Sequence, residues 1–294
     1  MSQQQVIAVT GATGGIGGRV AARLAAAGVR QRLIVRDAAR APEHPGAEVR
    51  TVPGGYADTA GLTAALTGAS TLLLVSAAEA EDRVAQHVSA VQAAAGAGIT
   101  HVVYLSFLGA APDATFTLAR DHHHTEAAVR EHGLGFTFLR DSLYLDFVPG
   151  MVGADGVLRG PAGSKGRVGA VARKDVADAA AAVLLDPAPH AGVTYDLTGP
   201  EAFTLPEAAA TMSDVCGRPI TFHHESVQEA FESRMDPAVP DFMIDAWVTT
   251  YLAIRDGELA TVSSAVQDLT GHAPRGLREV LEAHPGCLDH VRAS

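Results

Sequence analysis

"VTGATGGIGGRV", residues 9–20, decides the fold of this chain. Gly11, Gly14 and Gly17 stand three residues apart, after an apolar run and at the start of a helical pattern. Gly11 permits a tight turn, Gly14 lets the backbone approach a pyrophosphate, and Gly17 lets the helix pack closely. The unpaired amides of the helix start favour an anion. A glycine-rich turn without ligand is the alternative. The stretch predicts a dinucleotide site whose expected contacts are Gly11, Thr13, Gly14, Gly15, Ile16 and Gly17.

Apolar runs alternate with Ala-rich helical patterns along the first two thirds of the chain. The runs are short and bounded by Gly or polar residues, as in strands buried on both faces. They cover residues 5–11, 32–36, 48–52, 71–77, 101–106, 135–140 and 193–199. The helical patterns cover residues 17–28, 59–68, 82–98, 125–133 and 174–186. This alternation predicts an α/β fold, a Rossmann-like doubly wound parallel sheet.

The pattern changes in the second half of the chain. Residues 149–169 are typical of a loop, and helical patterns dominate from residue 200 onward. One of them opens with Thr204 and Glu207, which have the spacing of a capping box. We expect a Rossmann domain at 1–148, to which 170–199 return. Residues 149–169 and 200–294 would form a smaller, mostly helical lobe that binds substrate over the carboxyl edge of the sheet.

Composition and charge narrow the class of protein. The chain has 294 residues, of which 47% are apolar and 19% charged, as expected of a globular protein. No apolar run approaches the roughly 20 residues of a bilayer span, so we expect no membrane contact and a cytoplasmic location. The net charge of −11 disfavours nucleic acid as a partner. Cys216 and Cys287 lack metal-site spacing, so no metal is expected. The oligomeric state is left open, with a homodimer among the alternatives.

The end of the second expected strand indicates which dinucleotide binds. NAD sites place an acidic residue there for the ribose 2′-hydroxyl, whereas "LIVRD" (33–37) places Arg36 there and Asp37 one position later. A guanidinium suits a 2′-phosphate, so the sequence favours NADPH over NADH. Asp37 as a partner for a hydroxyl, and Arg36 as a solvated loop cation, are the alternatives.

Six stretches together resemble the NmrA-like family of atypical short-chain dehydrogenases, nearest its NAD(P)H:quinone oxidoreductase type 2 branch. They are "VTGATGGIGGRV", "LIVRD", "LLLVSA" (72–77), "AGITHVVYLSFLGA" (97–110), "HHHTEAAVREHGLGFTFLRDSLYLDF" (122–147) and "ARKDVADAAAAVL" (172–184). The resemblance covers most of the first 200 residues and implies an NADPH-dependent reductase, or a relative that kept the cofactor and lost the chemistry. One departure is Gly54-Gly55-Tyr56, where the family often has an Asp for the adenine side.

The chain cannot use the Tyr-x-x-x-Lys pair of typical short-chain dehydrogenases. Its five tyrosines lack a lysine four residues on, and its only lysines are Lys165 and Lys174. In related reductases a lysine stands where this chain has His122, which implies that His122 contacts the nicotinamide ribose and relays a proton. Ser106 is a second candidate for a catalytic and cofactor contact, while Ser76 and Ala77 should line the nicotinamide side.

Two further histidines, His123 and His124, follow His122. Adjacent helical side chains point about 100° apart, so the three cannot converge on one metal ion. We expect all three at the start of a helix, with the latter two facing solvent.

The missing pair also constrains the reaction. A reduced quinone is an aromatic anion that water can protonate, whereas a reduced ketone needs a positioned acid. The sequence therefore favours hydride transfer from NADPH to a small-molecule acceptor, a quinone or similar electrophilic carbonyl compound. A non-catalytic NADP(H) sensor that binds a protein partner and a biosynthetic ketone or imine reductase are the alternatives. The expected acceptor pocket is apolar, with Phe107, Leu108, Tyr144, Phe147 and Trp247.

Overall fold

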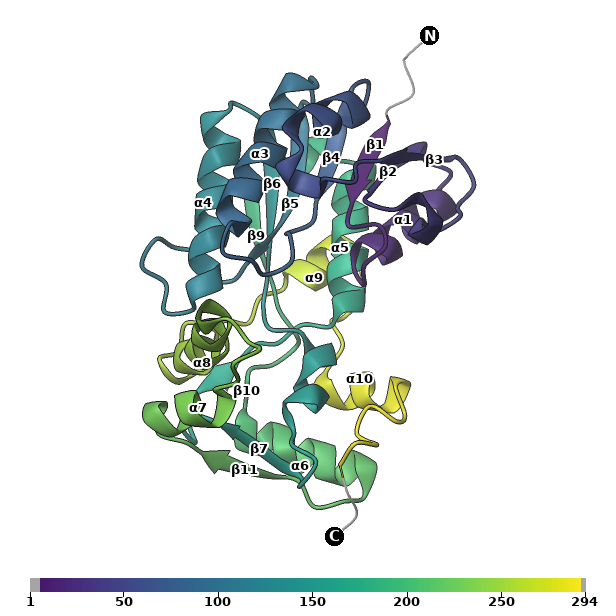
Figure 1. Cartoon of the computed structure of the whole chain (residues 1–294). Coiled ribbons are helices and arrows are strands. Elements are labelled where there is room, and N and C mark those ends of the chain that lie inside the picture. The colour runs from purple at the N-terminus through teal and green to yellow at the C-terminus, as the bar shows by residue number, and fades with distance from the viewer. Residues whose placement is uncertain (1–5, 292–294) are drawn as a thin grey trace. The chain divides into compact units, whose positions relative to one another are not determined.

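A computed structural model of the chain describes residues 6–291 and contains a seven-stranded sheet (Figure 1). The strand order is β3-β2-β1-β4-β5-β6-β9. The strands are β1 (Ile7–Thr10), β2 (Gln31–Val35), β3 (Ala47–Thr51), β4 (Thr71–Leu74), β5 (His101–Phe107), β6 (Gly135–Asp141) and β9 (Val193–Leu197). The pairs β3–β2, β2–β1, β1–β4 and β4–β5 are parallel. The Rossmann-like doubly wound sheet predicted from the sequence is confirmed.

The order of the strands places a switch point between β1 and β4. From β1 the chain adds β2 and β3 on one side, and then returns to add β4, β5 and β6 on the other. Val9 of β1 consequently lies between Leu33 of β2 and Leu73 of β4. In such sheets the ligand crevice opens beyond the carboxyl ends of the strands at this point. The fold therefore places the expected ligand site at the loops that follow β1 and β4.

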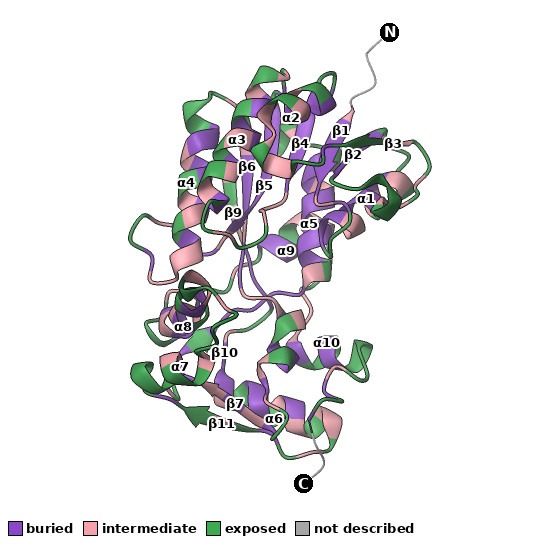
Figure 2. Cartoon of the chain, in the orientation of Figure 1, coloured by how far each residue is buried: buried purple, intermediate pink, exposed green. Residues whose placement is uncertain are grey.

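Five helices accompany the sheet, α1 (Gly17–Ala26), α2 (Thr59–Leu66), α3 (Arg83–Gly96), α4 (Thr117–Glu131) and α5 (Arg173–Leu185). Helices α2, α3 and α4 cover one face through buried residues such as Leu62, Val91 and Val129. Helices α1 and α5 are joined by the ion pair of Arg23 with Asp178. Figure 2 shows that burial concentrates in the central strands. Within residues 6–291, no helix combines the length and the apolar character needed to span a membrane.

Three local expectations need correction. Strand β3 is exposed along most of its length rather than buried on both faces, because it is the edge strand of the sheet. Helix α4 begins at Thr117, so the histidines 122–124 lie in its second turn and not at its start. Residues 149–169 are not a simple loop, because they contain two short strands, β7 (Val157–Gly160) and β8 (Arg167–Val168), whose partners follow residue 200.

The chain divides into two compact units. The first unit runs to residue 110 and includes 121–140 and 176–195, whereas the second comprises 111–120, 141–175 and the chain from 196 onward. The predicted assignment of substrate binding to residues 149–169 and 200–294 stays a prediction.

The second unit combines two small sheets with helices. Strand β7 pairs in parallel with β11 (Thr221–His224), and β8 pairs antiparallel with β10 (Phe203–Thr204). The helices are α6 (Leu205–Cys216), α7 (Val227–Arg234), α8 (Asp241–Arg255), α9 (Ala265–Thr270) and α10 (Leu277–Ala283). The expected capping box of α6 is confirmed, since Thr204 Oγ1 accepts from Glu207 N at 3.2 Å and Glu207 Oε2 accepts from Thr204 N at 2.7 Å.

Candidate dinucleotide site

The glycine-rich turn connects β1 to α1 in the first unit. Gly11 has a φ of 63°, and its carbonyl accepts a hydrogen bond from Gly14 N at 2.8 Å. A Cβ atom at Gly17 would collide with the main chain of Gly11 and Thr10, so only glycine allows the helix to start this close to the strand. Ile16, the N-cap residue, has no side-chain atom that can accept from the first amides of α1. Gly18 N donates to Gly14 O at 3.1 Å, and the other amides of this first turn are suited to a phosphate group.

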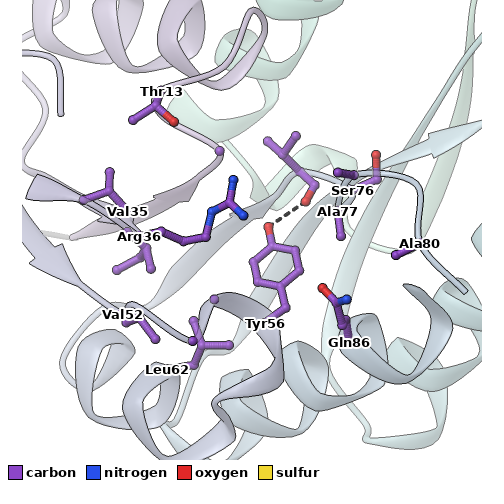
Figure 3. A pocket seen from close by; sticks show the side chains of 16 residues that line it. Thr13, Val35, Arg36, Val52, Tyr56, Leu62, Ser76, Ala77, Ala80 and Gln86 are labelled. Atoms are coloured by element: carbon purple, nitrogen blue, oxygen red, sulfur yellow. Dashed lines mark hydrogen bonds between the residues drawn. The ribbon is translucent and has the colours of Figure 1, made fainter. Parts of the chain in front are cut away.

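A cavity of about 360 Å³ opens beside this turn (Figure 3). Segments that follow β1, β2, β3 and β4 line it, as the switch point of the sheet requires. Five predicted cofactor contacts are among its lining residues, namely Gly11, Thr13, Arg36, Ser76 and Ala77. The other predicted contacts, Gly14, Gly15, Ile16, Gly17, Ser106 and His122, are not among them.

Arg36 extends from the end of β2 into this cavity (Figure 3). Its side chain passes over Gly55, where a Cβ atom would lie 3.4 Å from Arg36 Cδ and where φ is +58°. Among the described residues, none forms an ion pair with the Arg36 guanidinium. By contrast, Asp37 Oδ1 accepts a hydrogen bond from Ala39 N at 2.9 Å and caps a 3-10 turn. The geometry thus leaves a free cation in the cavity and commits the carboxylate beside it to the local backbone.

Tyr56 occupies the third position of the Gly54-Gly55-Tyr56 segment and points into the cavity (Figure 3). Its hydroxyl donates toward Val75 O and Thr10 Oγ1, each at 2.6 Å. Thr10 Oγ1 also accepts from Val75 N at 2.9 Å. Burial raises the pKa of Tyr56, so its hydroxyl stays protonated. Sequence reasoning missed this residue, although its place after two glycines near the expected adenine contact was a signal.

His122 is buried in a polar cluster of the first unit. Its Nε2 lies 3.1 Å from an amino group of Arg83, and its Nδ1 lies 2.9 Å from the Tyr104 hydroxyl. Because a guanidinium can only donate, Nε2 must be the acceptor, and Nδ1 carries the proton of a neutral ring. Burial first, and then the charge of Arg83, lower the pKa of His122 well below its ordinary value. This arrangement disfavours His122 as a general acid, whereas its contact with a ribose stays a prediction.

Ser106 is fully buried at the end of β5, and its hydroxyl donates to Glu126 Oε1 at 2.7 Å. The same carboxylate accepts hydrogen bonds from Nε and an amino group of Arg140, each at 2.8 Å, and from an amino group of Arg130 at 3.3 Å. Glu126 is itself fully buried. The bidentate pair with Arg140 fixes the Glu126 carboxylate, and this carboxylate in turn fixes the Ser106 hydroxyl. Its predicted contact with the cofactor or acceptor stays a prediction, and Glu126 was missed because the sequence shows only a helical carboxylate.

The predicted acceptor-pocket residues belong to different units. In the first unit, Phe107 is half-buried with its ring 6.1 Å from that of His122, whereas Leu108 is buried among core residues. In the second unit, the rings of Tyr144 and Phe147 lie 5.4 Å apart, and the Tyr144 hydroxyl donates to Asp141 at 2.7 Å. Phe147 and Trp247 are 49% and 41% exposed, so neither is a core residue. Their role in binding an acceptor stays a prediction.

Comparison with known proteins places the chain in a family. Residues 3–266 match the NmrA-like family. The chain is 37% identical to the (4-alkanoyl-5-oxo-2,5-dihydrofuran-3-yl)methyl phosphate reductase of Streptomyces griseus over 95% of this chain and 98% of that protein. It is 32% identical to quinone oxidoreductase 2 of Escherichia coli over 93% and 96%.

Solved structures agree with this placement. The NADPH complex of the Escherichia coli quinone oxidoreductase has a TM-score of 0.85 and 31% identity, and covers 94% of this chain and 99% of its own. Triphenylmethane reductase of Citrobacter has a TM-score of 0.82 and 32% identity, covering 97% and 99%. The chain therefore belongs to the NmrA-like family, within its branch of NAD(P)H-dependent oxidoreductases.

Proposed function

We propose that the protein is an NADPH-dependent reductase that transfers hydride to a quinone or a similar electrophilic, conjugated acceptor. The observation that carries the proposal is the Arg36 guanidinium, which has no ion-pair partner within residues 6–291 and lies in the cavity beside Gly11 and Thr13. A guanidinium recognises a phosphate through paired donors, so Arg36 would hold the 2′-phosphate that distinguishes NADPH from NADH. The first amides of α1 would hold the pyrophosphate.

The residues of the first unit bind and orient rather than exchange protons. Reduced nicotinamide, when bound, supplies the hydride. Tyr56 keeps its proton, and His122 is neutral with both ring nitrogens engaged. We propose that Ser106, held by Glu126, and His122, held by Arg83, support the nicotinamide end from behind the cavity, because both side chains are buried and neither lines it. Catalysis then rests on positioning two reactants, which can supply a large part of a rate enhancement.

An acceptor that needs no positioned acid fits this arrangement. A quinone takes up one hydride and becomes a hydroquinone anion, which solvent protonates. The relatives reduce acceptors of this electronic kind. One is named for quinones, another for triphenylmethane dyes, and a third for a furan ring with carbonyl substituents. A simple ketone would leave a strongly basic alkoxide, for which the described residues of the first unit offer no tyrosine and lysine pair.

The test is oxidation of reduced cofactor by purified protein. NADPH and NADH are each mixed with a benzoquinone, a naphthoquinone, a triphenylmethane dye and a simple ketone, and the absorbance of reduced nicotinamide is followed against an enzyme-free control. We expect NADPH to be consumed with the conjugated acceptors and not with the ketone. Tight NADPH binding without oxidation by any acceptor would instead indicate a sensor.

Gly14→Asp supplies the matched inactive variant. The carboxylate would lie against the pyrophosphate, so NADPH binding should be lost. Because a Cβ atom at Gly14 would lie 3.2 Å from Gly11 O, urea denaturation checks that the variant still folds. Unchanged NADPH affinity in this variant would contradict the assignment of the turn.

A further inference from the structure

One wall of the cofactor cavity has no regular secondary structure. It consists of the segment after β4, of which Val75, Ser76, Ala77, Ala78 and Ala80 line the cavity. A free segment of this kind would lose conformational entropy when a ligand binds against it. The contacts that hold it in place therefore bear on cofactor affinity.

The main chain of Ala77 is held on both sides by two basic residues of α3. Ala77 N donates to His87 Nε2 at 2.8 Å, and Ala77 O accepts from Arg83 Nε at 3.1 Å. The two peptide planes that meet at Ala77 are planar units, so fixing both of them fixes the φ and ψ of this residue. Neither Arg83 nor His87 lines the cavity itself.

Helix α4 in turn fixes these two side chains. His87 Nδ1 lies 2.8 Å from Thr125 Oγ1, whose own proton is donated to Asp121 O at 2.9 Å. His87 must therefore donate through Nδ1 and accept through Nε2, which is the tautomer that Ala77 N requires. Arg83 forms an ion pair with Asp121 at 3.1 Å and donates to His122 at 3.1 Å.

We propose that Arg83 and His87 are positioning residues for the cofactor, because they hold the Ala77 main chain in its binding conformation before NADPH arrives. The proposal rests on the proposed function, since it takes the cavity to be the NADPH site. Burial and the charge of Arg83 lower the pKa of His87 to about 3, so the neutral ring persists at all ordinary pH values.

The first arm of the test examines the protein without cofactor. Hydrogen exchange followed by NMR should show a protected Ala77 amide in the wild type, at least about tenfold faster exchange in His87→Leu, and retained protection in His87→Gln. The glutamine oxygen can take the place of Nε2 as acceptor. Thr125→Val, which keeps the side-chain shape and removes the partner of Nδ1, should give an intermediate rate and tests the proposal should the leucine variant not fold.

The second arm measures NADPH affinity by titration calorimetry. We expect the Kd, and the KM for NADPH, to rise about tenfold in His87→Leu, with kcat at saturating NADPH within about twofold of wild type. His87→Gln should stay near the wild type. The matched control is His101→Leu, which also removes a buried histidine bonded to a threonine, Thr137 at 2.9 Å, and should not change the Kd.

The outcomes separate the two proposals. A wild type that does not bind NADPH overturns both the proposed function and this inference. Tight binding by the wild type with an unchanged Kd in His87→Leu overturns the inference alone, as does an equal loss in His101→Leu, which would indicate a merely structural effect.

Discussion

Arg36 is the residue on which we propose that the coenzyme preference depends. It is exposed and unpaired within the described chain, and its stem passes over Gly55, where the φ of +58° disfavours any residue with a side chain. Asp37 is not available to bind a ribose hydroxyl in place of Arg36, because its carboxylate caps the following turn. We therefore expect this single cation to favour NADPH over NADH.

Arg36→Ala should raise the Kd for NADPH by about 10- to 100-fold, as expected for the loss of hydrogen bonds to a charged group. The Kd for NADH should change by less than about threefold, because NADH has no 2′-phosphate. Both affinities are measured by titration calorimetry. Arg40→Ala removes an exposed arginine of the next turn, which does not line the cavity, and should leave both values unchanged. Equal losses for the two coenzymes would contradict the assignment.

Glu126 is a buried carboxylate on which we expect the stability of the first unit to depend. It is fully buried and joins Ser106, Arg130 and Arg140, so it ties β5, α4 and β6 together. Removing one partner of such a pair leaves the other charge uncompensated.

Glu126→Gln should lower the free energy of unfolding by about 3 kcal/mol, measured by urea denaturation. Glu131→Gln, at an exposed position of the same helix, should change it by less than about 0.5 kcal/mol. Similar effects of the two substitutions would show that the buried network contributes little.

At the scale of elements, the position of α1 requires close contact between its first residue, Gly17, and the end of β1. A Cβ atom at Gly17 meets the backbone of Gly11 and Thr10, which cannot move without breaking the turn. Gly96 near the end of α3 is different, since a Cβ atom there would lie 3.6 Å from Thr63 Cγ2, an ordinary contact.

The same substitution should therefore have opposite effects in the two helices. Gly17→Ala should lower the free energy of unfolding by about 1–3 kcal/mol and weaken NADPH binding. Gly96→Ala should raise it by up to about 1 kcal/mol, because alanine is the better helix former. Thermal and urea unfolding measure both. A stabilised Gly17→Ala variant would show that the turn can yield.

At the scale of the whole molecule, stability is coupled to pH through buried neutral histidines. Burial, the largest cause in each case, lowers the pKa of His87 to about 3 and also lowers that of His101 and His122. In the unfolded chain these groups titrate near about 6.5. Below that pH the unfolded state binds more protons than the folded state, so acid favours unfolding.

The free energy of unfolding should be nearly constant between about pH 7 and 9 and fall as the pH drops from about 6.5 toward 3, by up to about 1.4 kcal/mol per pH unit for each histidine. Urea denaturation is measured at pH 7.5, 6.0 and 5.0. At these pH values most carboxylates stay ionised, so the change in stability reports the histidines. His87→Gln removes one titrating group and should reduce the slope. A slope equal to the wild type would mean that His87 does not titrate on unfolding.

The sequence predicted most of the sheet and part of the site. The strands and helices of the first unit were predictable because each has a local apolar pattern. The turn at 9–20 was predictable because steric constraints within a few residues require glycine there. The start of α4 was not, since polar residues at 117–124 hide the helical period. Strands β7 and β8 were not, since each is short and its partner lies far along the chain, with Thr221 opposite Val157 and Phe203 opposite Val168.

By itself the sequence determined the fold class, the dinucleotide turn and the presence of Arg36 at the end of β2, because these depend on residues close together in the chain. Only the tertiary structure decided the state of His122 and Ser106. Their hydrogen-bond partners, Arg83 and Glu126, come from other elements, and burial sets their protonation and orientation. A proton or a ribose contact depends on such non-local neighbours, which periodicity and spacing do not reveal.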